Sequence, residues 1–156
     1  MEIQIGQEAP DFKLHNTEKN LISLHDYNGK NVLLLFFPLA FTGVCTSELC
    51  SVRDTLAQYN DIGAEVIGIS VDSLFVLEKF KSENDLNFTL LSDFNKEVSK
   101  LYGCLYDTFV FDMAGVAKRS AFVIDKEGKV QYAEVLESAG DLPDFDAIHG
   151  VLNKIK

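Results

Sequence analysis

Cys45 is the residue whose type and place in the sequence point most directly to chemistry. It follows an apolar run that ends at Pro38, and it comes three residues after Thr42 in the segment PLAFTGVC. A cysteine in the first turn of a helix faces unpaired backbone N–H groups and the positive end of the helix dipole, and both favour the nucleophilic thiolate. The Thr42 hydroxyl is placed to hydrogen-bond the sulfur or a bound substrate. A lone cysteine is more often a small buried hydrophobic residue, but a strand-to-helix junction favours the reactive interpretation.

The elements expected around Cys45 alternate between buried strands and helices. Residues 31–37 (NVLLLFF) form a continuous apolar run that is typical of a strand buried on both faces, and residues 65–71 (EVIGISV) form a second. Helical spacing of apolar residues predicts a helix over about 45–60. Cys45 lies about 20° from Val52 on the wheel of this helix, on its core-facing side, so we expect the sulfur at the base of a pocket.

Shorter elements complete the pattern. Ser73 is the expected N-cap of a helix that runs to about residue 84. The remaining elements expected are a strand at 88–91, a helix at 96–102, a hairpin of strands 119–124 and 129–135 around the turn DKEG, and a closing helix at 144–156. This order indicates a three-layer α/β domain with a central mixed sheet. The aromatic stretch 105–118 has no clear period, and we predict that it is a loop over the site or an interface segment.

Composition excludes several functional classes. The chain has 156 residues, a length typical of one domain, so residues 1–156 are expected to form a single domain. Its net charge of −10 argues against nucleic acid or an anionic membrane as a partner, since both are negatively charged and bind positively charged protein surfaces. No apolar run approaches the roughly 18–20 residues that a membrane helix needs. Three cysteines and no signal peptide predict a protein of the reducing cytoplasm, with free thiols.

Several motifs together resemble one protein family. The run P-x-x-x-T-x-x-C, formed by Pro38, Thr42 and Cys45, resembles the active-site signature of the peroxiredoxins, the alkyl hydroperoxide reductase/thiol-specific antioxidant family. Further similar blocks follow the family order along nearly the whole chain: Gly6 with APDF at 9–12, VIGISVD at 66–72, LSD at 91–93 and RSAFVID at 119–125. The phrase FFPLAFTGVC is most similar to the alkyl hydroperoxide reductase E branch. The resemblance implies a thioredoxin-like fold.

The resemblance also implies a role for each residue of the site. Cys45 would attack the terminal oxygen of hydrogen peroxide or an organic hydroperoxide, release water or an alcohol, and become a sulfenic acid. Thr42 would hold the peroxide, and Pro38 would shield the thiolate from water. Arg119 would lie beside the sulfur and stabilise the charge as the O–O bond breaks, and Glu48 would orient this arginine. Without the resemblance, Arg119 reads as a solvated cation at a strand end and Glu48 as an acid on the helix dipole.

Two fates are open for Cys50. A cysteine five residues after the reactive one is typical of the bacterioferritin-comigratory-protein branch, where it would resolve the sulfenic acid. Five residues of helix separate the two Cα atoms by about 8–9 Å, beyond the ~7 Å limit for a disulfide. A resolving role therefore requires the first turns of the helix to unwind, and otherwise an external thiol resolves Cys45. Cys104, at a helix end, is expected to be a half-buried structural cysteine.

The partners and the rival functions follow from the same residues. Sulfur alone does the chemistry, so no cofactor is implied, and the electrons come from a thioredoxin-like or other thiol reductant. The resemblance implies a homodimer packed near the active site, although relatives with a cysteine five residues on are often monomers. A thioredoxin-like dithiol oxidoreductase would need C-x-x-C, and the cysteines and histidines fit no compact metal-ligand spacing. His15, His25 and His149 are expected at the surface. A non-catalytic peroxide sensor with an oxidisable Cys45 remains an alternative.

Overall fold

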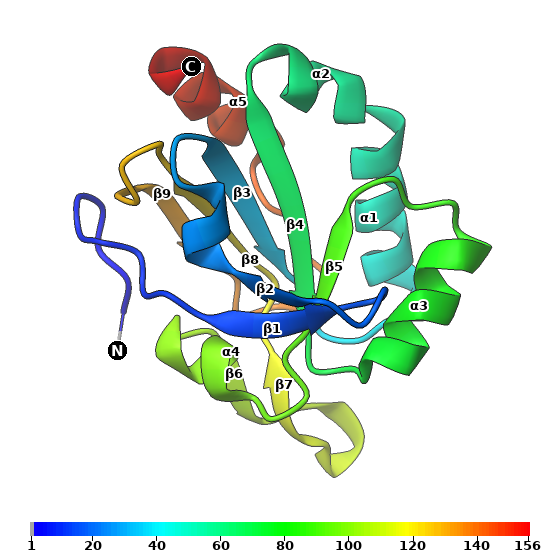
Figure 1. Ribbon diagram of the computed structural model, residues 1–156. Helices are drawn as coiled ribbons and strands as arrows, with labels where there is room; N and C mark the ends of the chain where they lie inside the picture. The colour runs from blue at the N-terminus through cyan, green and yellow to red at the C-terminus, as the bar shows by residue number, and fades with distance from the viewer. Residues whose placement is uncertain (1) are drawn as a thin grey trace.

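The computed structural model describes residues 2–156, which form a seven-stranded mixed sheet and a separate two-stranded hairpin (Figure 1). The strands of the large sheet lie in the order β2-β1-β5-β4-β3-β8-β9. The strands are β1 (Lys13–Asn16), β2 (Leu21–Ser23), β3 (Asn31–Phe36), β4 (Ala64–Ser70), β5 (Thr89–Ser92), β6 (Leu105–Thr108), β7 (Ala114–Ala117), β8 (Ser120–Ile124) and β9 (Val130–Val135). The helices are η1 (Leu24–Tyr27), α1 (Gly43–Asp54), α2 (Leu56–Asp61), α3 (Leu74–Glu83), α4 (Glu97–Leu101), η2 (Val110–Asp112) and α5 (Phe145–Ile155).

The three central strands β3, β4 and β5 are parallel, and their carboxyl ends meet at one edge of the sheet. All six residues of β3 are buried, as the continuous apolar run predicts for a strand covered on both faces. β8 pairs antiparallel with β3 and with β9, and β1 pairs antiparallel with β5. This pairing confirms the predicted thioredoxin-like three-layer α/β fold with a mixed sheet.

Two apolar clusters lie on the two faces of the sheet. One contains the buried side chains of α1, α2, α3 and α5, including Cys45, Leu49 and Tyr59. The other contains those of α4, η1 and the N-terminal segment, and it also takes in Cys104. The apolar faces of the helices therefore fix their place on the sheet, and α1 is held with its N-terminus at the carboxyl edge of the parallel strands.

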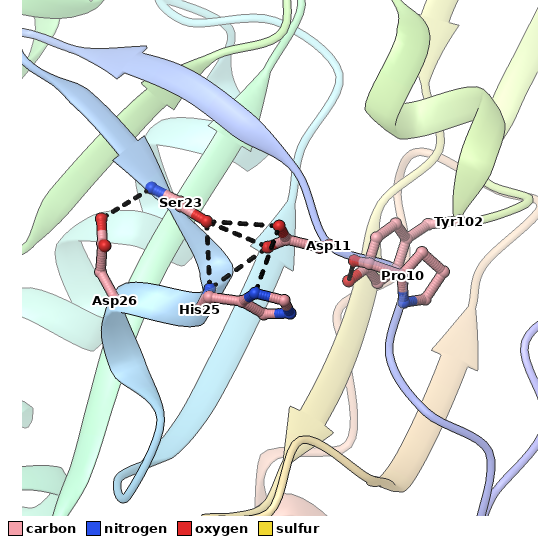
Figure 2. A network of polar contacts seen from close by, with 6 residues as sticks. All are labelled: Pro10, Asp11, Ser23, His25, Asp26 and Tyr102. Carbon is pink, nitrogen blue, oxygen red and sulfur yellow. Dashed lines mark hydrogen bonds and ion pairs between the residues drawn. The ribbon is translucent and has the colours of Figure 1, made fainter.

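The N-terminal APDF segment is anchored by a network of polar contacts (Figure 2). The Asp11 carboxylate accepts hydrogen bonds from the Ser23 hydroxyl at 3.1 Å and from the His25 backbone N–H at 3.2 Å, and it lies 3.6 Å from His25 Nδ1. Asp26 and Ser23 form a capping box at the start of η1. The Tyr102 hydroxyl donates to the Pro10 carbonyl at 2.6 Å. These contacts give the motif a structural role that joins the first residues to the sheet.

Several predicted elements differ from the structure. The helix expected over 45–60 is two helices, α1 and α2, and the break falls at Thr55, whose hydroxyl donates to the Ser51 carbonyl. The stretch 105–118 is not a loop, because β6 and β7 form a hairpin whose tip is η2. Its predicted place over the site is confirmed, since Phe109 and Val110 line the same pocket as Cys45. Each of its strands has only four residues, which is too short for a visible period of two. The β1–β2 pair was not predicted for the same reason, since these strands have four and three residues.

Candidate active site

Cys45 lies in the first turn of α1, directly after the loop that leaves β3. The helix starts at Gly43 with Thr42 as its N-cap residue, so the strand-to-helix junction lies where the sequence placed it. The side chain of Cys45 is only 1% exposed. The backbone N–H groups of this first turn have no partner within the helix, and they surround the sulfur with positive partial charge.

Arg119 and Glu48 complete the site. Arg119 stands immediately before β8, which pairs with β3, and its Nη2 donates to the Cys45 sulfur at 3.2 Å. Glu48 lies three residues after Cys45 on α1, so both side chains share one face of the helix. Arg119 Nη1 donates to Glu48 Oε1 at 2.5 Å, and Nη2 also donates to the Ala139 carbonyl at 3.1 Å. The structure thus brings Cys45, Glu48 and Arg119 into direct contact.

Burial controls the charges of this group. Arg119 is 1% exposed and Glu48 is fully buried. Burial raises the pKa of Glu48 to about 7, although the adjacent Arg119 guanidinium acts in the opposite direction. Burial also opposes the charge of Arg119, but Glu48 and then Cys45 outweigh it and raise the pKa of this guanidinium. The arginine therefore stays charged and provides the local positive field that the acidic chain as a whole lacks.

A pocket of about 290 Å³ opens onto the sulfur. Its lining is mainly apolar, with Arg119 as the charged group. The lining residues are Pro38, Thr42, Gly43, Val44, Cys45, Phe109, Val110, Arg119, Ala139 and Gly140. This agrees with the expectation of a sulfur at the base of a pocket. A small polar oxidant fits here, with its oxygen atoms between the helix N-terminus and the guanidinium.

Thr42 and Pro38 lie at the rim and in the wall of this pocket. The Thr42 hydroxyl is exposed and donates its proton to the Leu39 carbonyl at 2.7 Å. Its oxygen makes no capping bond to the helix, so its lone pairs are free to accept a hydrogen bond. Pro38 is buried, and it contributes no N–H to the loop.

The other two cysteines occupy different environments. Cys50 lies on α1, half-buried, and its thiol donates to Asn84 Oδ1 at 3.8 Å. Both Cys45 and Cys50 are free thiols within one continuous helix. Cys104 is fully buried, and burial raises the pKa of its thiol to about 12. The prediction of a half-buried Cys104 is therefore wrong, because the residue packs in the apolar cluster that holds Tyr102 and Phe122.

Residues 2–156 contain no group of three or more His, Cys, Asp and Glu side chains arranged to hold a metal ion. His15 and His25 are exposed, as expected. His149 is partly buried instead, with its ring stacked on Tyr59 at 4.6 Å between centroids. Within the same residues, no helix combines the length and apolar character needed to cross a membrane.

Four contributors to the site were not singled out as individual residues in the sequence. Phe109 and Val110 reach the pocket from the tip of the hairpin, and the Ala139 carbonyl comes from a loop near the C-terminus. Phe109 and Val110 belong to the stretch 105–118, which we predicted over the site, whereas the Ala139 carbonyl carries no signal because a backbone carbonyl acts only through its position. The fourth is Asp72, which accepts a hydrogen bond from the loop before Thr42. A carboxylate just after a buried strand is a visible signal, since β4 ends at the same edge as β3.

Comparison with known proteins agrees with this geometry. The AhpC/TSA family profile matches residues 5–133. Alkyl hydroperoxide reductase E of Mycobacterium tuberculosis is 37% identical over 145 residues, which are 91% of each chain. A putative peroxiredoxin bcp of Coxiella burnetii is 41% identical over 132 residues, covering 83% of this chain and 87% of the relative.

The fold of a solved relative also matches. The crystal structure of peroxidoxin BcpB from Mycobacterium tuberculosis superimposes with a TM-score of 0.87 over 99% of both chains, at 28% identity. The family profile and the relatives together cover the site, the sheet and most of the helices. The chain therefore belongs to the AhpC/TSA family and is a peroxiredoxin, a thiol-dependent peroxidase.

Proposed function

We propose that Cys45 is the peroxidatic nucleophile of this peroxidase. The observation that carries the proposal is the 3.2 Å contact between Arg119 Nη2 and the Cys45 sulfur inside the first turn of α1. The thiolate attacks the terminal oxygen of the peroxide, so an S–O bond forms as the O–O bond breaks. The O–O electron pair leaves with the alkoxide or hydroxide, which takes a proton to become an alcohol or water. Cys45 ends as a sulfenic acid.

The neighbouring side chains each support this step in our proposal. Arg119 faces the sulfur, where it stabilises the thiolate and the charge that develops on the leaving oxygen. Glu48 holds the guanidinium in place through its 2.5 Å bond. The Thr42 oxygen accepts a hydrogen bond from the peroxide, because its own proton is committed to Leu39. Pro38 keeps water from the sulfur as part of the buried pocket wall.

We further propose that the sulfenic acid is resolved by Cys50, with an external thiol as the alternative route. The reductant is then a thioredoxin-like protein that reduces the Cys45–Cys50 disulfide. Both thiols are free and lie five residues apart on α1. We also assign the protein to a reducing compartment, the cytoplasm, because three widely spaced cysteines do not fit a disulfide-stabilised secreted domain.

We also propose that the protein is a homodimer that associates near the active site, and not a monomer. Large apolar side chains are exposed after the carboxyl ends of β3, β4 and β5 and at the hairpin tip, at the edge where Cys45 lies. This apolar edge consists of Phe41, Val44, Phe75, Val76, Phe94, Val110 and Phe111. Such a surface is typical of a protein–protein interface.

Peroxide consumption by the wild type and by Cys45→Ser tests the proposed nucleophile. The wild type is expected to turn over hydrogen peroxide or an organic hydroperoxide with a thiol reductant, and Cys45→Ser to lose this turnover completely. Cys104→Ser is the matched control, because that thiol is fully buried on the other face of the sheet. Equal consumption by the wild type and Cys45→Ser would overturn the assignment. A wild type that is oxidised once without turnover would be a sensor instead.

A further inference from the structure

The loop between β3 and α1 contains a residue in an uncommon backbone conformation. Phe41 has φ of +66°, in the left-handed region that bulky side chains rarely adopt. A non-glycine residue of this kind is strained and persists only where its surroundings hold it. Phe41 immediately precedes Thr42, the N-cap of α1. Its conformation therefore sets the direction in which the helix, and with it Cys45, enters the site.

A carboxylate from the neighbouring strand holds this loop. Asp72 follows β4, and its Oδ2 accepts a hydrogen bond from the Ala40 backbone N–H at 2.8 Å. Ala40 is the residue directly before Phe41, so the bond fixes the Leu39–Ala40 peptide, one residue before the left-handed position. On the other side, the Thr42 hydroxyl donates to Leu39 across the same turn. The ring of Phe41 packs edge-on against Phe80, with 5.2 Å between centroids.

Asp72 is itself fixed by hydrogen bonds from two strand ends. The hydroxyl of Ser70, a fully buried residue, donates to the same Oδ2 atom at 2.7 Å. The Ser92 hydroxyl, at the end of β5, donates to the Asp72 carbonyl at 2.6 Å. The carboxylate is therefore tied to β4 and the Asp72 backbone to β5, so this residue relates the position of both strands to the loop after β3.

We infer that Asp72 is a positioning residue for the peroxide reaction, acting through the Ala40 N–H on the turn that carries Thr42 and Cys45. The inference rests on the proposed function of Cys45. Asp72 is not among the residues that line the pocket, so it does not touch the peroxide. Its bond keeps Thr42 and the first turn of α1 aligned with Arg119, which enters from β8 on the other side of β3.

The test compares two reactions of the same thiol in Asp72→Ala. Peroxide reduction needs Thr42, the helix N-terminus and Arg119 correctly aligned around the Cys45 sulfur. Alkylation by iodoacetamide needs only an accessible thiolate. A displacement of about 1 Å costs on the order of 100-fold in such aligned reactions. We expect the second-order rate constant with hydrogen peroxide to fall about 10- to 100-fold, and the alkylation rate to stay close to that of the wild type. Rapid quenching with mass spectrometry of the Cys45 peptide measures both.

Two variants serve as controls for this test. Asp72→Asn keeps a carbonyl oxygen that accepts from Ala40, so it is expected to restore most of the peroxide rate. Asp144→Ala removes a bond of the same kind, from a carboxylate to the Ala147 N–H at the start of α5, and is expected to leave the peroxide rate unchanged. If Asp72→Ala does not fold, Asp72→Ser takes its place, since its shorter side chain also loses the Ala40 contact.

Three outcomes would overturn the inference. They are a wild-type peroxide rate in Asp72→Ala, a parallel fall of the peroxide and alkylation rates, and an Asp72→Asn variant as slow as Asp72→Ala. Failure of the proposed function looks different, because the wild-type Cys45 itself would then not react with peroxide. Amide hydrogen exchange at Ala40 gives a structural readout, and it is expected to become faster in Asp72→Ala than in Asp72→Asn.

Discussion

Glu48 and Arg119 form an ion pair that is almost completely withdrawn from solvent. Within residues 2–156, Glu48 Oε2 and Arg119 Nε have no hydrogen-bond partner, so the desolvation of both groups is only partly compensated. A buried pair of this kind adds little to stability. The pair lies beside the Cys45 sulfur, and in the reaction we propose it directs the guanidinium at the charge that forms.

The raised pKa of Glu48 makes a prediction about stability. A carboxyl whose pKa rises on folding, here from 4.5 to about 7, holds its proton more tightly in the folded state. Its contribution to stability is full below pH 4.5 and is lost as the pH rises through about 7. We therefore expect the free energy of unfolding of the wild type, relative to Glu48→Gln, to fall by up to about 3 kcal/mol over this window and to be level above it.

Urea denaturation of both proteins between pH 4.5 and pH 8.5 measures this difference. The glutamine is isosteric and does not titrate, so it removes the Glu48 contribution without changing the volume of the site. A difference that is constant with pH, or one that grows as the pH rises, would contradict the prediction.

Some residues of the site could be predicted from the amino-acid sequence alone and others could not. Cys45, Thr42 and Pro38 were visible because a turn between a strand and a helix concentrates its functional groups within one short segment. The role of Glu48 followed only from the family resemblance, because an acid in the first turns of a helix is already explained by the helix dipole. Arg119 was recognisable only through the family resemblance, since an arginine at the start of a strand is usually exposed and this one is 1% exposed. The Ala139 carbonyl depends on a contact across the fold, which a single sequence does not encode locally.

At the scale of elements, α1 carries both the reactive thiol and its proposed partner. An intact helix keeps Cys45 and Cys50 too far apart for a disulfide, so the rate of resolution depends on how easily the turns between them unwind. Ser47 lies between the two cysteines and is exposed. It allows the helix to be stabilised or weakened without disturbing the pocket.

We predict opposite effects for two substitutions at this position. Alanine favours the helix and glycine disfavours it by about 1 kcal/mol relative to alanine. Ser47→Gly is therefore expected to form the Cys45–Cys50 disulfide about fivefold faster than Ser47→Ala after peroxide treatment, with equal rates of peroxide reduction. Peptide mass spectrometry over a time course measures the disulfide. A sulfenic acid at Cys45 that persists in both variants would show that an external thiol resolves it.

The helices and strands with strong periodicity were predictable, and the short ones were not. The buried runs in β3 and β4 identified the centre of the sheet, and the capping residue Ser73 identified the start of α3, where its hydroxyl accepts from the Val76 N–H. The β6–β7 hairpin was not predicted from the sequence, because its strands pair with each other and not with the main sheet. Elements of four residues depend on tertiary contacts more than on their own pattern.

At the scale of the whole molecule, charge and apolar surface act against each other. Each chain carries a net charge of −10, so two copies repel at long range. The apolar edge near Cys45 provides the short-range attraction that we propose for the homodimer. We also propose that the chain is one domain, because β3, β4 and β8 contribute buried residues to both apolar clusters.

Phe75→Glu tests this balance. Phe75 is 67% exposed at the start of α3, and a carboxylate at this point would be buried in the interface next to another negatively charged copy. We expect a dimerisation constant at least about tenfold weaker, measured by sedimentation equilibrium. Raising the salt concentration should strengthen the wild-type dimer, because it screens the net charge.

Ile5→Glu is the matched control for the dimer. Ile5 is also exposed, at 65%, but it lies near the start of β9, at the opposite edge of the sheet. This substitution is expected to leave the association unchanged. A wild type that sediments as a monomer at all concentrations would contradict the homodimer.

The burial of Cys45 means that only small reactants reach its sulfur. A peroxide enters a pocket of about 290 Å³, but the active-site thiol of another protein does not reach a sulfur that is 1% exposed. In the proposed cycle, the two half-reactions therefore use different conformations of α1: the peroxide meets the intact helix, and a protein reductant meets the unwound one. Disulfides of other proteins therefore do not exchange with Cys45 in the reduced enzyme. In the proposed cycle, steric access alone then requires that the peroxide reacts first and the reductant second.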